Sequence, residues 1–398
     1  EHFQRNGYRV YATGKIFHNN HHTVPLFGKD RFGAPASFGP FPWDGKARHG
    51  FDVRHPAMKP PWGLNGFETI VPLSEVPVVT ADESKGVPGF SGWRDRGRPF
   101  RYLHDDDRDK MVDELSVDFV RKLLATDPSN EQPFFITVGF LRPHCPWVVP
   151  KKYFDLFPLE SIQLPPYLPD DLDDCGEFMR QMKKNSSWYT RLERLEQAYG
   201  DQLGWRMWIR AYLACVAFVD DRVGELLDAL DASPYAENTV VVFTSDHGFH
   251  MGEKDLLIKK TCWEEATRVP LIIRAPGVSR ANLACKTPVS LVDIYPTLVE
   301  LCDLPQQPNS DGNGQLLDGV SLRALLTDRG IVSWTGPGAA LSVIEGNDPV
   351  KIGEVPRMER QHFTLRTERW RYVLYNNGDE ELYDHSADPH EWKNLAGD

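Results

Sequence analysis

The sequence predicts an α/β fold with a mostly parallel sheet and a small antiparallel subdomain at the C-terminal end. Short, almost continuously apolar runs such as 133–140 are typical of strands in a parallel sheet. Segments with apolar residues at helical spacing lie between these runs, and this alternation indicates helices on both faces of the sheet. From residue 362 onward, short runs separated by turn residues indicate antiparallel strands instead.

The composition fits a folded protein of this class. The chain has 398 residues, of which 41% are hydrophobic and 26% charged, and this length predicts two or three domains or one large domain with an appendage. The net charge of −12 argues against nucleic acid as a partner, because binding a phosphate backbone depends on clustered Lys and Arg. The apolar runs are far shorter than the roughly 18 residues of a membrane span, so we expect none.

The first half contains a strand, long loops, a helix and a second strand. Residues 1–7 are typical of a helix end that stops at a glycine and leads into a strand at 8–12. The stretch 19–100, rich in Gly, Pro, Trp and His, predicts long loops, and we expect these loops, with 160–207, to shape a substrate pocket. Apolar spacing predicts a helix over 109–125, and a strand buried on both faces follows at 133–140.

The second half continues the alternation and then changes character. We expect a boundary in the Gly- and Pro-containing stretch 329–356, which divides the chain into an α/β core over 1–328 and a C-terminal subdomain over 329–398. The expected elements of this half are a helix at 208–230, a buried strand at 238–245, a further strand at 269–274, a helix at 291–302, and short strands at 362–366, 371–375 and 381–383 around a turn at 376–378.

Polar, titratable side chains follow three of the predicted strands. Because the carboxyl ends of parallel strands meet at one edge of a sheet, we expect these side chains to converge. Lys259 lies 13 residues beyond Asp246 (259 − 246), close enough to fold back to the same place. Taken singly, each cluster also fits a solvated loop or a turn, so their convergence is the functional signal. The residues are Lys15 and His18 after the first strand, His144 after 133–140, and Asp246 and His247 after 238–245.

Together these residue types suit a metal-assisted reaction on a tetrahedral anion. Asp246 offers the hard oxygen that Ca²⁺ or Mg²⁺ prefers, whereas the imidazole of His247 favours softer metals, so the residues leave the metal open. Two lysines can neutralise charge on the anion's oxygens, and two histidines can transfer protons near neutral pH.

The motifs that hold these residues resemble those of the formylglycine-dependent sulfatases, in the alkaline-phosphatase-like superfamily. Gly14-Lys-Ile-Phe-His18, Pro143-His-Cys-Pro146 and Ser245-Asp-His-Gly248 occur in the order found in iduronate-2-sulfatase-like members. The stretches 264–272 and 381–395 are also similar to sulfatase segments. The resemblance covers essentially the whole chain and implies an alkaline-phosphatase-like sheet.

The resemblance also implies a role for each residue. Asp246 and His247 would bind one divalent metal, Ca²⁺ ahead of Mg²⁺. Lys15, Lys259 and His144 would bind substrate, with both lysines on the sulfate oxygens. His18 would act as a base beside the hydrated formylglycine, and His144 would serve the leaving-group oxygen. The implied protein hydrolyses sulfate esters of a carbohydrate or related compound in a secreted, periplasmic or lysosomal location.

The sequence departs from the family pattern in two places. The family's formylglycine arises from a cysteine in a Cys-x-Pro/Ala-x-Arg motif, and none of the six cysteines has this context. The family also has two metal-binding aspartates after an N-terminal apolar strand, and these have no match either. We expect the motif, the aspartates and the N-terminal strand or strands of the sheet to lie before Glu1, and the 398-residue chain to be inactive or nearly so.

Two other functions stay open. A phosphodiesterase or phosphonate hydrolase of the same superfamily would have similar metal and anion sites. A non-catalytic protein that binds sulfated glycans would need no nucleophile. The six cysteines form no Cys-x-x-Cys pair, and one or two disulfides are compatible with their dispersed positions.

Overall fold

A computed structural model describes most of the chain. It divides into two compact units, each made of two stretches: unit 1 is Glu1–Leu164 with Arg194–Ala236, and unit 2 is Pro165–Glu193 with Glu237–Asp398. The boundary expected in 329–356 lies largely outside the described residues, so the domains 1–328 and 329–398 stay a prediction. The described residues are 1–18, 26–43, 68–76, 80, 82–85, 92–125, 132–185, 190–308, 316–327, 334–345 and 357–397.

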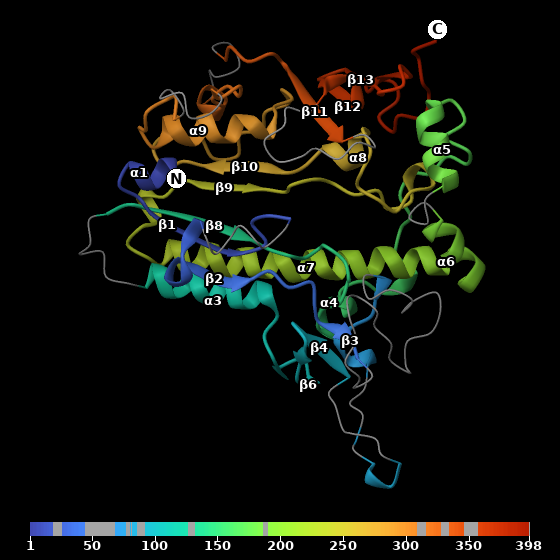
Figure 1. Ribbon diagram of the computed structural model, residues 1–398, viewed down its shortest axis with the longest axis horizontal. Coiled ribbons are helices and arrows are strands. Elements are labelled where there is room, and N and C mark those ends of the chain that lie inside the picture. The colour runs from blue at the N-terminus through green and yellow to red at the C-terminus, as the bar shows by residue number, and fades with distance from the viewer. Residues whose placement is uncertain are drawn as a thin grey trace. The chain divides into compact units, whose positions relative to one another are not determined.

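Unit 1 contains a parallel sheet with the strand order β2-β1-β8 (Figure 1). β1 (Arg9–Gly14) pairs parallel with both β8 (Phe134–Gly139) and β2 (Phe32–Pro35). The predicted strands at 8–12 and 133–140 and their parallel arrangement are therefore confirmed. β2 lies in the stretch expected as loops, where four residues containing Gly and Pro give no strand pattern.

Two long helices of unit 1 run along this sheet (Figure 1). α3 (Val112–Leu124) confirms the helix expected at 109–125, and α7 (Leu203–Asp231) begins five residues before the helix expected at 208–230. The Glu114 carboxylate accepts the backbone N–H of Met111 at 2.8 Å, which satisfies a donor that the first turn of α3 leaves unpaired. The remaining elements of unit 1 are α1 (His2–Arg5), α4 (Lys151–Asp155), and the short strands β3 (Phe41–Pro42), β4 (Trp93–Asp95), β5 (Arg98–Pro99), β6 (Tyr102–His104) and β7 (Asp107–Arg108).

Two glycines at the end of the β1–β8 pair allow the strands to approach closely. Gly14 and Gly139 are register partners, and a Cβ on Gly139 would lie 1.9 Å from the carbonyl oxygen of Lys15. Gly14 also has a φ of +76°, which an L side chain rarely adopts. The backbone of Lys15 is thus placed by a contact that only glycine permits.

We expect Gly139→Ala to destabilise the protein by about 3 kcal/mol, because the added methyl group forces the two strand ends apart. Urea unfolding followed by circular dichroism measures this loss. Gly224→Ala in α7 is the matched control, because no atom from outside the adjoining helix backbone lies within 4 Å of its Cβ position and alanine favours a helix by about 0.5–1 kcal/mol. Equal stability of the two variants would contradict the close approach.

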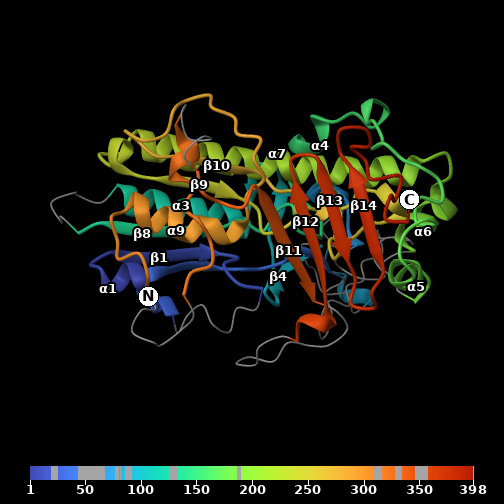
Figure 2. The ribbon, with the colours of Figure 1, turned by 90° about the horizontal axis from the view of Figure 1, so that it is seen from above.

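Unit 2 contains a strand pair and a separate C-terminal sheet. β9 (Val241–Thr244) and β10 (Leu271–Arg274), expected at 238–245 and 269–274, pair antiparallel, with Phe243 opposite Ile272. The order β11-β12-β13-β14 is antiparallel throughout, as Figure 2 shows. β12 (Gln361–Thr367), β13 (Trp370–Leu374) and β14 (Glu380–Asp384) confirm the predicted subdomain, and β11 (Ala339–Glu345) is a fourth strand that the sequence did not predict.

Further helices lie between residues 177 and 301. α9 (Ile294–Leu301), preceded by a 3₁₀ turn, confirms the helix expected at 291–302. α5 (Glu177–Asn185) and α6 (Arg191–Tyr199) lie within 160–207, so the expectation of loops there is wrong. Their charged residues dominate the apolar ones, which hides the helical spacing. Within the described ranges, none of the helices combines the length and apolar character of a membrane span, and the six cysteines form no disulfide.

The expected burial of two strands is wrong. β8 is half-buried along its whole length, and β9 is half-buried to exposed. In the described sheets, each of them has a paired neighbour on one side only, β1 for β8 and β10 for β9. A strand at the edge of its sheet leaves side chains near the open edge partly accessible to solvent.

Candidate functional site

Lys15 directly follows β1 in unit 1. Its backbone N–H donates to the carbonyl of Gly139 at 2.7 Å, which continues the β1–β8 ladder by one residue. Lys15 is half-buried, and His18, three residues further, is exposed. Both residues therefore lie at the carboxyl edge of the parallel sheet, as predicted.

His144 lies in the loop that follows β8, at the same edge of the sheet. The buried carboxylate of Asp113, in the first turn of α3, accepts the backbone N–H groups of Leu141 at 2.7 Å and Arg142 at 3.1 Å. The buried Arg142 guanidinium in turn donates to the carbonyl oxygens of His144 at 3.3 Å and Gly39 at 3.0 Å. Burial raises the pKa of Asp113, while Arg142 and the two N–H groups act in the opposite direction.

The ring of His144 has a defined orientation. Its Nδ1 lies 2.6 Å from the carbonyl oxygen of Cys145, and its ring centroid lies 4.8 Å from that of Phe38. Because a carbonyl oxygen only accepts hydrogen bonds, Nδ1 carries the proton of the neutral ring. Nε2 is then the atom with a lone pair, able to exchange a proton with a ligand.

Asp246, His247 and Lys259 come together in unit 2. Asp246 and His247 follow β9, and Lys259 donates from Nζ to His247 Nε2 at 3.0 Å. Asp246 Oδ2 lies 3.6 Å from the same nitrogen, with 65% of the aspartate side chain exposed against 32% of the histidine. The expectation that Lys259 folds back beside Asp246 and His247 is confirmed, whereas the chemical roles of these residues stay predictions.

The hydrogen bonds of His247 define its tautomer. Nδ1 donates to the carbonyl oxygen of Gly248 at 2.7 Å, and Nε2 accepts from the Lys259 ammonium, which can only donate. A histidine that holds a metal commonly has this arrangement, with one ring N–H on a backbone carbonyl and the other nitrogen free of a proton. His247 and Asp246 therefore fit two ligands of a divalent cation, fewer than the six to eight that Ca²⁺ takes.

A tight loop brings Lys259 back to His247. Gly248 donates its N–H to Ala266 in α8 (Glu264–Thr267) at 2.8 Å, and a Cβ on Gly248 would lie 1.9 Å from the carbonyl oxygen of Glu265. The N–H of His250 donates to the carbonyl oxygen of Ile258 at 2.9 Å, so the segment just after His247 lies beside the segment just before Lys259. Glycine at 248 is required because α8 lies against its α-carbon.

A buried ion-pair network includes Glu264, the first residue of α8. Arg371, which is 1% exposed, contacts the carboxylates of both Glu264 and Glu391, and His385 Nε2 donates to Glu391 at 2.8 Å. Glu264, His385 and Glu391 each place a potential ligand atom within 4.8 Å of the others, as a metal site would. Arg371 and Arg366 already bring two guanidinium groups to these three residues, so they fit an ion-pair network better than a cation site.

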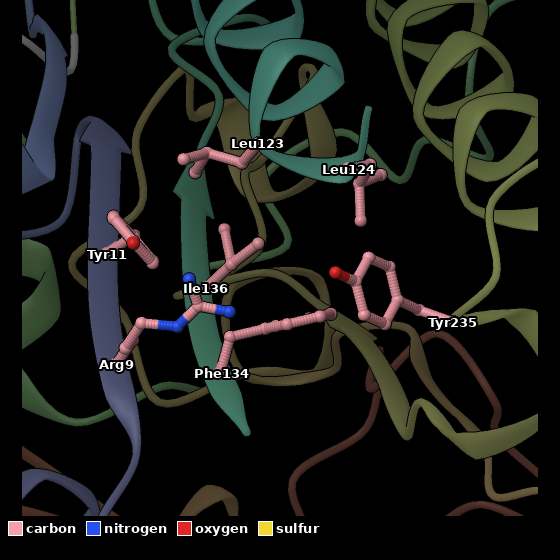
Figure 3. Close-up of a pocket in the computed structure, with 7 residues that line it drawn as sticks. All are labelled: Arg9, Tyr11, Leu123, Leu124, Phe134, Ile136 and Tyr235. Atoms are coloured by element: carbon pink, nitrogen blue, oxygen red, sulfur yellow. The ribbon is translucent and has the colours of Figure 1, made fainter. Parts of the chain in front are cut away.

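Unit 1 contains a small pocket at one end of its parallel sheet (Figure 3). It is a shallow hollow of about 260 Å³, a volume that includes open solvent, near the amino ends of β1 and β8 and opposite to the end that carries Lys15. Figure 3 shows the Arg9 guanidinium over β8, beside Phe134 and Ile136. Arg9 donates to the carbonyl of Gln132 at 3.2 Å. The pocket therefore contains none of the predicted site residues.

Several contributors to these sites gave no functional signal in the sequence. Asp113 acts on the His144 loop from 28 residues away, and the partners of Arg371 lie as far as 109 residues away. Arg142 stands two residues before His144 in a recognised motif, and this neighbourhood is the one signal that could have found it. Glu391 and Glu264 lie in the segments similar to sulfatases, but their pairing is visible only in the fold.

Solved structures that resemble this chain define its fold class. A protein in complex with its substrate D-glucosamine-2-N,6-O-disulfate matches 99% of this chain and 76% of its own, with a TM-score of 0.60 and 20% identity. A phosphonate monoester hydrolase of Agrobacterium radiobacter matches 99% of this chain and 75% of its own, with a TM-score of 0.62 and 21% identity. Together with the strand-end site residues, this likeness defines an α/β protein with the alkaline-phosphatase-like fold.

Sequence comparisons then define the family. The Sulfatase family pattern matches residues 1–304, and the pattern of the N-sulphoglucosamine sulphohydrolase C-terminal region matches 252–398. The chain is 33% identical to a sulfatase of Formosa agariphila, over 100% of this chain and 65% of that protein. It is 27% identical to the iduronate 2-sulfatase of Mus musculus, over 77% of this chain and 54% of that protein. The chain belongs to the sulfatase family, and it spans about half to two thirds of the length of these curated relatives.

Proposed function

We propose that this chain carries the sulfate-binding and proton-transfer side chains of a sulfuric ester hydrolase whose substrate is a sulfated carbohydrate. The observation that carries the proposal is the Asp246–His247–Lys259 cluster after β9, in a chain of the sulfatase family. The names of the relatives and the disulfated glucosamine bound to one structural neighbour support a sulfated sugar as substrate.

The lysines provide the charge that holds the anion. Lys15 and Lys259 donate ammonium hydrogens to the sulfate oxygens, where charge accumulates as the ester bond breaks. Lys259 has a partner in the absence of an anion, since its Nζ donates to His247 at 3.0 Å. Exchange of this hydrogen bond for a bond to sulfate keeps the ammonium group paired in both states.

The histidines move protons at defined atoms. His144 has Nδ1 engaged by the carbonyl of Cys145, which leaves Nε2 to exchange a proton with the leaving-group oxygen. His18 acts as the base beside the nucleophile, for which the family uses formylglycine. His18 is exposed at the same edge of the sheet, so it is open to a proton acceptor or donor in solvent.

Asp246 and His247 would hold a divalent cation, with Ca²⁺ favoured over Mg²⁺. The fit rests on the hard oxygen of Asp246 and on the His247 tautomer, which presents an unprotonated Nε2 beside Asp246 Oδ2. When bound, the cation would neutralise oxygen charge on the substrate. A location outside the cytosol, whether secreted, periplasmic or lysosomal, is part of the same proposal.

Titration of the 398-residue chain with inorganic sulfate, in buffer with Ca²⁺, tests the proposal by calorimetry, and ion chromatography follows sulfate release from a sulfated disaccharide. We expect saturable sulfate binding and no release, because no cysteine in the sequence has the family's nucleophile motif. Removing Ca²⁺ with a chelator should weaken sulfate binding. Release of sulfate would contradict the expected inactivity, and failure to bind sulfate would contradict the anion site.

The same titration separates the two alternatives. Inorganic phosphate bound much more tightly than sulfate would favour a phosphodiesterase or phosphonate hydrolase, the activity named for one structural neighbour. A non-catalytic glycan-binding protein would bind the sulfated disaccharide without binding the free anion, because its contacts would be spread over the sugar rings.

A further inference from the structure

Glu391 occupies an unusual place for a carboxylate. It is 0% exposed, and its φ of +57° lies in the left-handed region that non-glycine residues seldom adopt. Such a conformation persists only where surrounding contacts fix it. The contacts of Glu391 therefore hold its backbone and its charge at a defined point of unit 2.

The side chain of Glu391 is fully paired. It accepts the backbone N–H of Glu264 at 3.0 Å and hydrogen bonds from Arg371 Nε and His385 Nε2, the latter at 2.8 Å. Burial acts to raise the pKa of Glu391, but Arg371 and His385 more than offset it, so the pKa is lowered. Glu391 is thus an ionised carboxylate at the start of α8.

One set of contacts leads from Glu391 to His247. Glu264, whose N–H binds Glu391, is the first residue of α8, and Ala266 of the same turn accepts the N–H of Gly248 at 2.8 Å. The carbonyl of Gly248 in turn accepts Nδ1–H of His247 at 2.7 Å. The orientation of the His247 ring therefore depends on the position of α8.

A second set of contacts leads from Glu391 to the loop before Lys259. Lys254 Nζ donates to the carbonyl oxygen of Glu391 at 2.6 Å and to Asp171 at 3.1 Å, and the Lys254 side chain is 1% exposed. Lys254 also has a positive φ, of +54°. It lies at the tip of the loop that connects His247 to Lys259, so this contact fixes how the chain returns.

We propose that Glu391 is a positioning residue for the His247–Lys259 pair, through its side chain on α8 and its carbonyl on the loop tip. This inference rests on the proposed function, which assigns cation binding to His247 and sulfate binding to Lys259. A purely structural role would make Glu391 equivalent to any other buried carboxylate of unit 2. Glu381 is such a residue: it is 0% exposed and binds Trp263, Tyr383 and the N–H of Gly176. It reaches Lys254 only through the ring faces of Trp263 and Tyr383, whereas Glu391 is hydrogen-bonded directly to Glu264 and Lys254.

Glu391→Gln in the full chain tests the proposal, with Glu381→Gln as the matched control. The readouts are the imidazole nitrogen signals of His247 in ¹⁵N NMR, the affinity for inorganic sulfate, and thermal unfolding. We expect both variants to lose stability. Glu391→Gln should also shift the His247 signals toward a mixture of tautomers and weaken sulfate binding at least tenfold, whereas Glu381→Gln should change the affinity less than twofold.

Each outcome bears on the proposal. A folded Glu391→Gln protein with parental His247 signals and sulfate affinity would overturn it, and so would equal effects of the two variants on His247. If Glu391→Gln does not fold, His385→Phe keeps a ring but removes the hydrogen bond that His385 donates to Glu391, and it should shift the same signals by a smaller amount. Unchanged signals would again overturn the proposal. If the unmodified chain did not bind sulfate, that result would count against the proposed function alone. The His247 signals would still show whether Glu391 determines the orientation of the His247 ring.

Discussion

Replacing Lys259 by methionine should weaken binding of inorganic sulfate about a hundredfold. The substitution keeps a long apolar stem and removes the ammonium that donates to His247 Nε2 at 3.0 Å. A hydrogen bond to a charged group contributes about 1.5–3 kcal/mol, and a hundredfold change in affinity corresponds to about 2.7 kcal/mol. Isothermal titration calorimetry of the full chain with sulfate measures the change.

The neighbouring lysine supplies the control for Lys259. Lys260 is exposed, and Lys260→Met removes the same charge one residue away. We expect less than a threefold effect, because an exposed charge interacts with a bound anion mainly through solvent and is screened by salt. Similar losses of sulfate affinity in the two variants would show that binding depends only on the overall charge of the loop, and they would contradict a direct contact with Lys259. Lys259→Arg should recover part of the affinity, since the cation is kept while its shape changes.

The site residues of unit 2 could be foreseen because their signals are local. Asp246 and His247 directly follow a predicted strand, which places both at the end of that strand. A separation of 13 residues limits the distance between Lys259 and Asp246. The structure then adds the direction of each hydrogen bond, from Lys259 to His247 Nε2 and from Nδ1 to the Gly248 carbonyl. Those directions depend on α8, whose contact with Gly248 no local pattern predicts.

Elements with several turns of regular apolar spacing were predictable from the sequence. The prediction failed for short elements. α3 and α7 contain several turns of regular apolar spacing, and both were located to within a few residues. β2 has four residues, Phe-Gly-Ala-Pro, and joins the sheet through its pairing with β1. Pairing between distant segments determines such a strand, so composition alone indicated a loop. The exposure of β9 had the same origin, because the number of paired neighbours is a property of the sheet.

The buried charges show most clearly what sequence reading misses. Acidic residues in the first turn of a helix, as Asp113 and Glu114 are in α3, fit an ordinary interaction with the helix dipole. Asp113 instead turns inward and satisfies two backbone N–H groups of the loop that carries His144. Its partners follow the next strand, and only the packing of α3 against the sheet brings them together.

Asp113→Asn should therefore destabilise the protein by about 3 kcal/mol and displace His144. The amide can accept from only one of the two N–H groups at a time with its oxygen, so it turns an NH₂ group toward the other donor. Leaving a buried donor unpaired costs about 1–3 kcal/mol, and loss of the carboxylate also removes negative charge near the buried Arg142 guanidinium. Urea unfolding gives the stability, and the ring signals of His144 in NMR give the displacement.

A second aspartate on the same helix separates this effect from a general effect of lost charge. Asp118 of α3 pairs with Lys110 at 2.5 Å, with 34% and 54% of the two side chains exposed. Surface pairs of this kind contribute at most about 1 kcal/mol, so Asp118→Asn should leave both stability and the His144 signals close to the parent. If Asp113→Asn were equally mild, the loop after β8 would be held by Arg142 and its carbonyl partners without the carboxylate. His144 would then be positioned by the strand end and by the Arg142 guanidinium.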